Sequence, residues 1–256
     1  MGIFDFLRKS NPPPEGTPSD KKAPSDKKVA GPARVVADKR AQTYDRLEAI
    51  QTLCAMKSEE ASMALLQRFK FSIDPSITDQ EEKDLAYEGI LQAGKAAVPA
   101  VRDFCLRAES LTWPLKVLRE LLDDDEYRAE ILLLLERFDT EYARNVEPKV
   151  QTIIALEDVP SDAEVREAVE RFLEDVNETV RFHAIQTTFV QENEESVPAI
   201  VRMLAAEESV RVKNKAAEGL MQRGWVIPED QREAMRTALR DTQGYGLSAD
   251  GKVIQR

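Results

Sequence analysis

The sequence predicts an all-α fold, a right-handed α-solenoid of about six helix pairs with a disordered N-terminal tail and a short C-terminal β-hairpin. Three observations predict it. From about residue 41 onward apolar residues recur at three- and four-residue spacing, as at Leu47, Ile50, Leu53 and Cys54. Several of the seven prolines in the same region stand at or just before the start of an apolar-periodic run, as expected at helix starts. Similar segments return along the chain at a constant spacing.

The composition excludes several classes of protein. The 256 residues are 42% hydrophobic, 32% charged and 6% aromatic, with a net charge of −11. The longest apolar run, Ile131 to Leu135, is far shorter than the roughly 20 residues of a membrane span, and the N-terminus shows no secretory signal. The single histidine and two cysteines leave little for metal chemistry. We therefore expect a cytoplasmic protein without cofactor or metal ion.

Residues 1–9 form a short amphipathic tip. On a helical wheel Ile3, Phe4 and Leu7 share one side, and Phe6 lies next to them. Such a tip can dock in an apolar groove of a protein partner, or rest weakly on a membrane surface. A frayed chain start with a few apolar residues is the simpler alternative.

Residues 10–40 have the composition of a disordered linker. Six of the 13 prolines lie there, and the fragment PSDKK occurs twice, at 18–22 and 24–28. This stretch has too little apolar surface to offset the entropic cost of ordering it. The first 40 residues carry nine basic and five acidic side chains, whereas the rest of the chain carries 27 and 42. Because an acidic body repels phosphate, we expect no nucleic-acid partner.

The body, residues 41–243, contains an internal repeat. Val165, Val169 and Phe172 correspond to residues 32 positions further on, and AYEGILQAG at 86–94 aligns with AAEGLMQRG at 216–224. A helix pair of this length cannot bury its apolar face alone, so the repeat predicts stacked pairs. The predicted pairs are 43–57/60–71, 79–93/96–109, 112–122/125–138, 145–156/161–174, 177–191/194–206 and 209–223/228–240.

Two stretches carry a family resemblance. ETVRFHAIQTTF at 178–189 and ESVRVKNKAAEGLMQRG at 208–224 resemble HEAT repeats of the short bacterial type, the phycobilisome-lyase HEAT-like repeat. In that signature Val-Arg or Val-Lys precedes a small pair, here Ala184-Ile185 and Ala216-Ala217. The resemblance is clear over 161–240 and is lost over 110–160. It implies that the second helices of the pairs line the concave side.

Each successive second helix carries an arginine that could form, together with the others, a ladder for an acidic peptide. The alternative is that each arginine pairs with a nearby carboxylate of the chain, as Glu167 could with Arg171. The arginines are Arg68, Arg102, Arg128, Arg171, Arg202 and Arg236.

The C-terminal residues 244–256 contain Asp250-Gly251 between short apolar arms. This pattern is typical of a β-hairpin turn. A hairpin here would cover the exposed end of the last helix pair.

No catalytic constellation is visible in the sequence. His183 has no nucleophile in a recognisable motif, and no glycine-rich phosphate loop is present. We therefore expect a non-enzymatic scaffold or adaptor that binds a protein partner through its solenoid surface, with a docking tip at the N-terminus. The alternatives are a phycobilin-lyase-like enzyme or chaperone acting on a protein substrate, and a peripheral membrane adaptor that uses residues 1–9.

Overall fold

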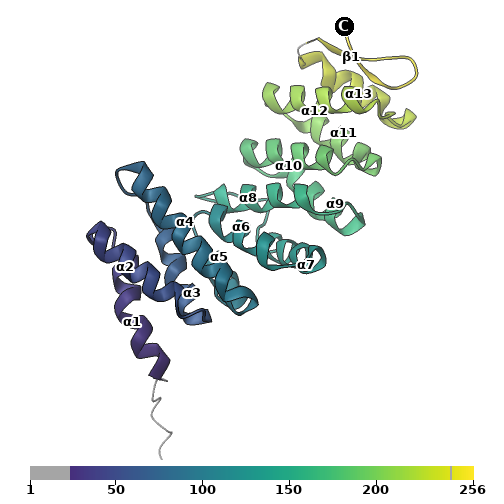
Figure 1. Cartoon of the computed structure of the whole chain (residues 1–256). Helices are drawn as coiled ribbons and strands as arrows, with labels where there is room; N and C mark the ends of the chain where they lie inside the picture. Colours follow the sequence, from purple (N-terminus) through teal and green to yellow (C-terminus); the bar gives the residue numbers. More distant parts are fainter. Residues whose placement is uncertain (1–23, 243) are drawn as a thin grey trace, which may run out of the picture.

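The computed structural model describes residues 24–242 and 244–256. In this part the chain is mostly helical and ends in a two-stranded antiparallel hairpin (Figure 1). The expected tip, residues 1–9, and residues 10–23 of the expected linker lie outside the described residues.

The elements follow one another along the chain as α-helices joined by short 3-10 segments and turns. The α-helices are α1 (Pro24–Ala37), α2 (Thr43–Cys54), α3 (Glu59–Leu66), α4 (Ser76–Ala93), α5 (Val98–Cys105), α6 (Thr112–Leu121), α7 (Asp124–Leu135), α8 (Glu147–Ala155), α9 (Ala163–Glu170), α10 (Glu178–Val190), α11 (Val197–Ala206), α12 (Val210–Arg223) and α13 (Arg232–Ala238). The 3-10 segments are η1 (Gln67–Lys70), η2 (Gly94–Ala97), η3 (Leu156–Asp158), η4 (Arg171–Glu174), η5 (Glu194–Ser196), η6 (Glu229–Gln231) and η7 (Leu239–Asp241). The strands are β1 (Tyr245–Leu247) and β2 (Val253–Gln255).

Helix α1 lies in a region where the sequence analysis expected a disordered linker. Residues 24–37 are helical, so the prediction of disorder over 10–40 is wrong in this part. Val36 is fully buried, and Val29 and Ala33 pack against the core. These three residues are spaced as one face of a helix, and α1 lays that face on α2 and α3. The high proline content of residues 10–40 favoured the prediction of disorder, although the segment has a short apolar face. The helix is stable only when this face packs on the first helix pair.

The predicted helix pairs are present as α2/α3 through α12/α13. Pro99, Pro148 and Pro198 each lie in the first turn of a helix, where the missing N–H costs nothing. Gly224 ends α12 in the left-handed conformation, with φ of 63°, as expected for a glycine C-cap. Local sequence therefore sets where these helices begin and end.

The pairs lie beside one another in chain order (Figure 1). Each first helix contacts the first helix of the next pair, from α2 to α12. The row bends near α6 and α7, and α4, α6 and α8 lie on the inner side of the bend (Figure 1). The resemblance implied that the second helices would lie there. On the other side of the row a hollow lies between α5 and α7 and includes Val98 and Leu133.

An ion pair joins the two helices of several pairs, and in one of them both side chains are fully buried. A basic residue near the start of the first helix reaches an acidic residue at the end of the second, and this basic residue recurs every 32 positions. The ion pairs are Lys149–Asp175 at 2.7 Å, Arg181–Glu207 at 2.7 Å and Lys213–Asp241 at 3.0 Å. The basic residue of the sequence signature therefore links the two helices of a pair through an ion pair between them.

The first helix pair uses a related cluster of charges. Arg46 of α2 and Arg68 of η1 both donate to the carboxylate of Glu82 in α4, at 2.7 and 2.6 Å. Arg68 also contacts Asp79 at 2.6 Å. Since the side chains of Arg46, Arg68 and Glu82 are almost completely buried, this cluster ties α2/α3 to the next pair.

The C-terminal hairpin confirms the sequence prediction. Strand β1 pairs with β2 in antiparallel register, with Leu247 opposite Val253. Gly251 in the connecting turn has φ of 86°, a conformation that favours glycine. Val253 is buried, and the strands contact α12 and α13. The hairpin therefore packs on the last helix pair.

Helix α12 approaches α10 closely at Gly219. A Cβ atom at this position would overlap the ring of Phe189. The absence of a side chain at Gly219 thus lets the two first helices pack at this distance.

We expect Lys149→Ala to lower the free energy of unfolding by about 3–5 kcal/mol, because Asp175 would stay buried without its partner. Urea denaturation followed by circular dichroism measures the change. Arg236→Ala is the control, since its exposed ion pair with Glu233 contributes no more than about 1 kcal/mol. Equal losses in the two variants would contradict the role given to the buried pair.

We expect Gly219→Ala to destabilise the protein by about 1–3 kcal/mol, because Phe189 would have to move. Gly31→Ala in α1 is the matched control. Its Cβ meets nothing within 4 Å, so this change should raise stability by about 0.5–1 kcal/mol through helix propensity alone. Thermal unfolding of both variants tests the contrast, and a stabilising Gly219→Ala would refute the close approach.

Candidate functional site

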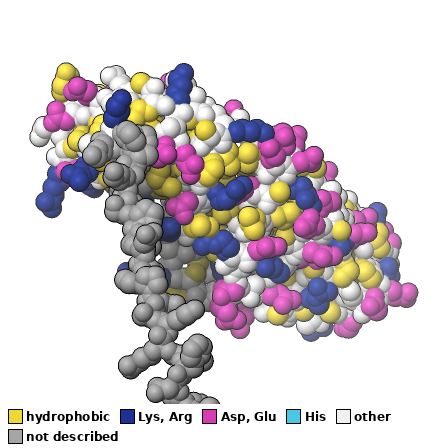
Figure 2. All heavy atoms as spheres, turned by 90° about the horizontal axis from the view of Figure 1, so that it is seen from below, with side chains coloured by type: hydrophobic (Ala, Val, Ile, Leu, Met, Phe, Trp, Pro, Cys, Tyr) yellow, Lys and Arg dark blue, Asp and Glu magenta, His cyan; other side chains and the backbone are white. Residues whose placement is uncertain are grey.

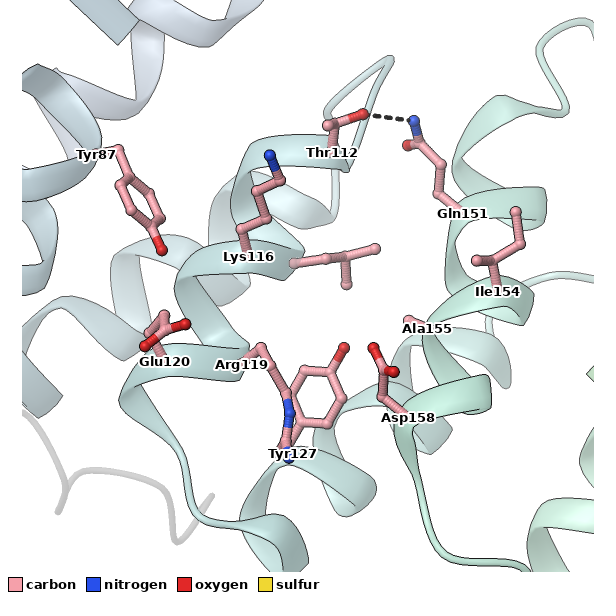
Figure 3. A pocket seen from close by; sticks show the side chains of 11 residues that line it. Tyr87, Thr112, Lys116, Arg119, Glu120, Tyr127, Gln151, Ile154, Ala155 and Asp158 are labelled. Atoms are coloured by element: carbon pink, nitrogen blue, oxygen red, sulfur yellow. Dashed lines mark hydrogen bonds between the residues drawn. The ribbon is translucent and has the colours of Figure 1, made fainter. Parts of the chain in front are cut away.

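A groove of about 500 Å³ lies between α4, α6 and α8 (Figure 3). Three of the helices that line it, α4, α6 and α8, lie on the inner side of the bend in the row of helices (Figure 1). Leu115 and Ala155 are buried and Ile154 is half-buried, and together they make its apolar floor. Polar side chains from the same helices stand around that floor (Figure 3). An apolar floor with a few polar groups at its edge is the usual form of a binding site.

Aromatic rings hold the wall of the groove on the α4 side. Trp113 stacks on Phe69 with ring centres 5.1 Å apart and planes 3° from parallel. The ring of Tyr87 is tilted against Trp113 at 5.7 Å. The Lys116 ammonium lies over the Trp113 ring at 5.0 Å. These contacts fix the position of Tyr87, which lines the groove.

The opposite side of the groove has a buried tyrosine next to an acidic residue. Tyr127, in the first turn of α7, is 2% exposed, and its hydroxyl points towards the carboxylate of Asp158 in η3 (Figure 3). Burial, and then the charge of Asp158, raise the pKa of Tyr127 to about 12. Burial, and then the charge of Glu120, raise the pKa of Tyr87. Both hydroxyls therefore stay protonated at neutral pH.

The two carboxylates of the groove have no bonding partner within the described part of the chain. Neither Glu120 nor Asp158 forms a hydrogen bond or ion pair there. The nearby guanidinium of Arg119 instead donates to Asp124 at 2.8 Å and lies 5.0 Å over the Tyr127 ring. The acids are thus free to meet a ligand.

One end of the groove is closed by a hydrogen-bond network. The side-chain amide of Gln151 donates to Thr112 at 2.9 Å and to Ser110 at 3.1 Å. The amide oxygen of Gln151 accepts from the backbone N–H of Leu111. The start of α6 is thereby fixed to α8.

The six arginines of the expected ladder lie in different environments. The prediction that Arg68 belongs to a partner-binding ladder is wrong, because its side chain is 0% exposed and pairs with Glu82 in the buried cluster. Arg102 donates to Glu130 at 2.5 Å. Arg128 contacts Asp162 and Glu164, both at 2.6 Å.

The remaining three arginines differ from one another. Arg171 donates to the backbone oxygen of Leu135 and stacks on Phe172, whereas Glu167 contacts Arg166. Arg236 pairs with Glu233 at 3.3 Å.

Arg202 is exposed and has no hydrogen-bond or ion-pair partner in residues 24–242 and 244–256. Most of the ladder therefore serves contacts inside the chain. The candidate tip residues Ile3, Phe4, Phe6 and Leu7 lie outside the described residues.

The sequence analysis did not single out the groove residues. They concentrate in 110–160, where the repeat signature is lost, and that loss was the available signal. Tyr87, Tyr127 and Asp158 come from three different helix pairs and meet only through the packing of those pairs.

Charged side chains of both signs are mixed with apolar ones on the face seen in Figure 2. Within residues 24–242 and 244–256, no group of three or more His, Cys, Asp or Glu could hold a metal ion. No helix in this part of the chain has an apolar stretch long enough to cross a bilayer.

Comparisons with protein-family models, with curated proteins and with solved structures find no match to this chain.

We expect Asp158→Asn to lower the pKa of Tyr127 from about 12 to a value that is still above 10. The negative charge of Asp158 is lost in this variant, whereas the burial of Tyr127 remains. The phenolate absorbance during alkaline titration, with Tyr127→Phe subtracted, measures this value. The surface change Asp230→Asn should leave it unchanged. A Tyr127 pKa insensitive to Asp158→Asn would contradict the geometry described for this side of the groove.

Proposed function

We propose that this protein is a HEAT-like α-solenoid that works as a non-enzymatic scaffold or adaptor in the cytoplasm. It binds a segment of a protein partner in the groove between α4, α6 and α8. Residues 1–9 are its second contact, a docking tip for the same assembly. The partner contributes apolar side chains to the floor around Ile154 and polar groups to the edge.

The observation that carries this proposal is the groove itself. Its floor is apolar, and the carboxylates at its edge are unpaired among the described residues. Stacked helix pairs expose a long surface, and the inner side of a bend is where a bound segment contacts several pairs at once. The groove also presents groups that the chain does not use for itself, in contrast to most of the arginine ladder.

We expect Ile154→Glu to abolish stoichiometric recovery of a partner by the tagged full-length protein from native extract, because a charge would be placed on the apolar floor. Val190→Glu is the control, since Val190 is 44% exposed at the end of α10 and outside the groove. Ile154→Ala, which adds no charge, should weaken recovery while it keeps the fold.

Thermal unfolding shows whether each variant is folded. Unchanged recovery by folded Ile154→Glu and Ile154→Ala variants would refute the groove as the binding site. Equal loss in Val190→Glu would show that the effect does not belong to the groove.

A further inference from the structure

The groove has two places where a tyrosine meets an acid, and we call them the acidic corners. One consists of Tyr87 of α4 and Glu120 of α6, and the other of Tyr127 of α7 and Asp158 of η3. Figure 3 shows the hydroxyl of Tyr127 directed towards the carboxylate of Asp158, and the carboxylate of Glu120 on the same side of the groove as Tyr87. The corners stand on opposite sides of the apolar floor.

We propose that the partner segment is basic, and that its lysine or arginine side chains bind the carboxylates of Glu120 and Asp158. This inference rests on the function proposed above and names the chemistry of the ligand for the same groove. The cationic groups enter the acidic corners, while apolar parts of the segment lie on the floor between them.

The first argument is that the two cationic side chains that line the groove, Lys116 and Arg119, make their contacts with other groups of the protein and not with Glu120 or Asp158. Lys116 lies over Trp113, and Arg119 is held by Asp124 and by the Tyr127 ring. Glu120 and Asp158 thus have no hydrogen-bonded counter-ion in the described chain, and Arg119 interacts with Asp158 only through its charge. A lysine or arginine of a partner can supply that counter-ion in a charge-assisted hydrogen bond, which is stronger than a neutral one.

The second argument is the presence of the tyrosines. Their pKa values are raised, so the hydroxyls are neutral at physiological pH and can accept a hydrogen bond from a cation. The ring of Tyr87, which is half-buried, offers flat apolar surface for the methylene chain of lysine or for the guanidinium plane of arginine. Carboxylate and aromatic ring together fit a long cationic side chain better than an apolar one.

The third argument is the charge of the whole body. Residues 41–256 carry 27 basic and 42 acidic side chains. This excess attracts a basic segment over distance and disfavours both an acidic peptide and a nucleic acid.

The test is selection from a library of short random peptides on the full-length protein. We expect lysine and arginine to be enriched among the peptides that bind the wild type. The enrichment should disappear with the double variant Glu120→Gln/Asp158→Asn. The matched control is Glu81→Gln/Asp230→Asn, which makes the same change in net charge at exposed sites outside the groove and should keep the enrichment.

One selected basic peptide is then measured by fluorescence anisotropy. We expect Glu120→Gln and Asp158→Asn each to weaken its affinity about tenfold. The affinity for the wild type should also fall as salt is added, because exposed charges are screened. An affinity that neither variant changes would overturn the proposal.

The outcomes separate this inference from the proposed function. If apolar peptides without lysine or arginine are selected, and Ile154→Glu abolishes their binding, the groove is the site but the basic ligand is refuted. If acidic peptides are selected, the basic ligand is refuted as well. If selected peptides bind equally to all variants, or none is selected, both proposals fail.

Discussion

The regular part of this structure depends on a buried ion pair inside the helix pair. Lys149 with Asp175 is the fully buried example, with side chains 1% and 0% exposed. Burying two charges costs free energy unless they meet at hydrogen-bonding distance, so such a pair tolerates one register of the two helices only. An ion pair at the corresponding place recurs in the next two pairs, where Glu207 is fully buried and Asp241 is 69% exposed, and it gives three consecutive pairs a common contact. The apolar core then forms between units of equal shape.

The groove lies where this contact is missing. In α6 the fourth residue is Leu115, whereas α2, α10 and α12 have Arg46, Arg181 and Lys213 at that position. Leu115 is buried and belongs to the floor of the groove. No ion pair joins the described helices α6 and α7 in this way, and α7 is linked to α5 by the half-exposed Arg102, which donates to the buried Glu130. The row bends there, and its surface becomes available to a ligand.

Much of the fold could be predicted from local sequence, because helix ends and apolar faces are local properties. Prolines at helix starts and Asp250-Gly251 as a turn were each correct. Helix α1 was missed, because Val29, Ala33 and Val36 stabilise a helix only when a neighbouring surface covers them. The candidate site was not predicted at all, since the loss of a repeat signature shows where a surface changes and not what it becomes.

The sequence by itself determined the helices, their pairing along the chain and the hairpin at the end, because these follow from residues within about one repeat of each other. Only the tertiary structure decided which charged side chains pair within the protein and which face the groove. Arg68 and Asp158 look equally available in a linear sequence, yet Arg68 is buried against Glu82 and Asp158 is open to the groove. The physical reason is that the partner of a charge is set by packing between helices far apart in the chain, and that packing is a property of the whole stack.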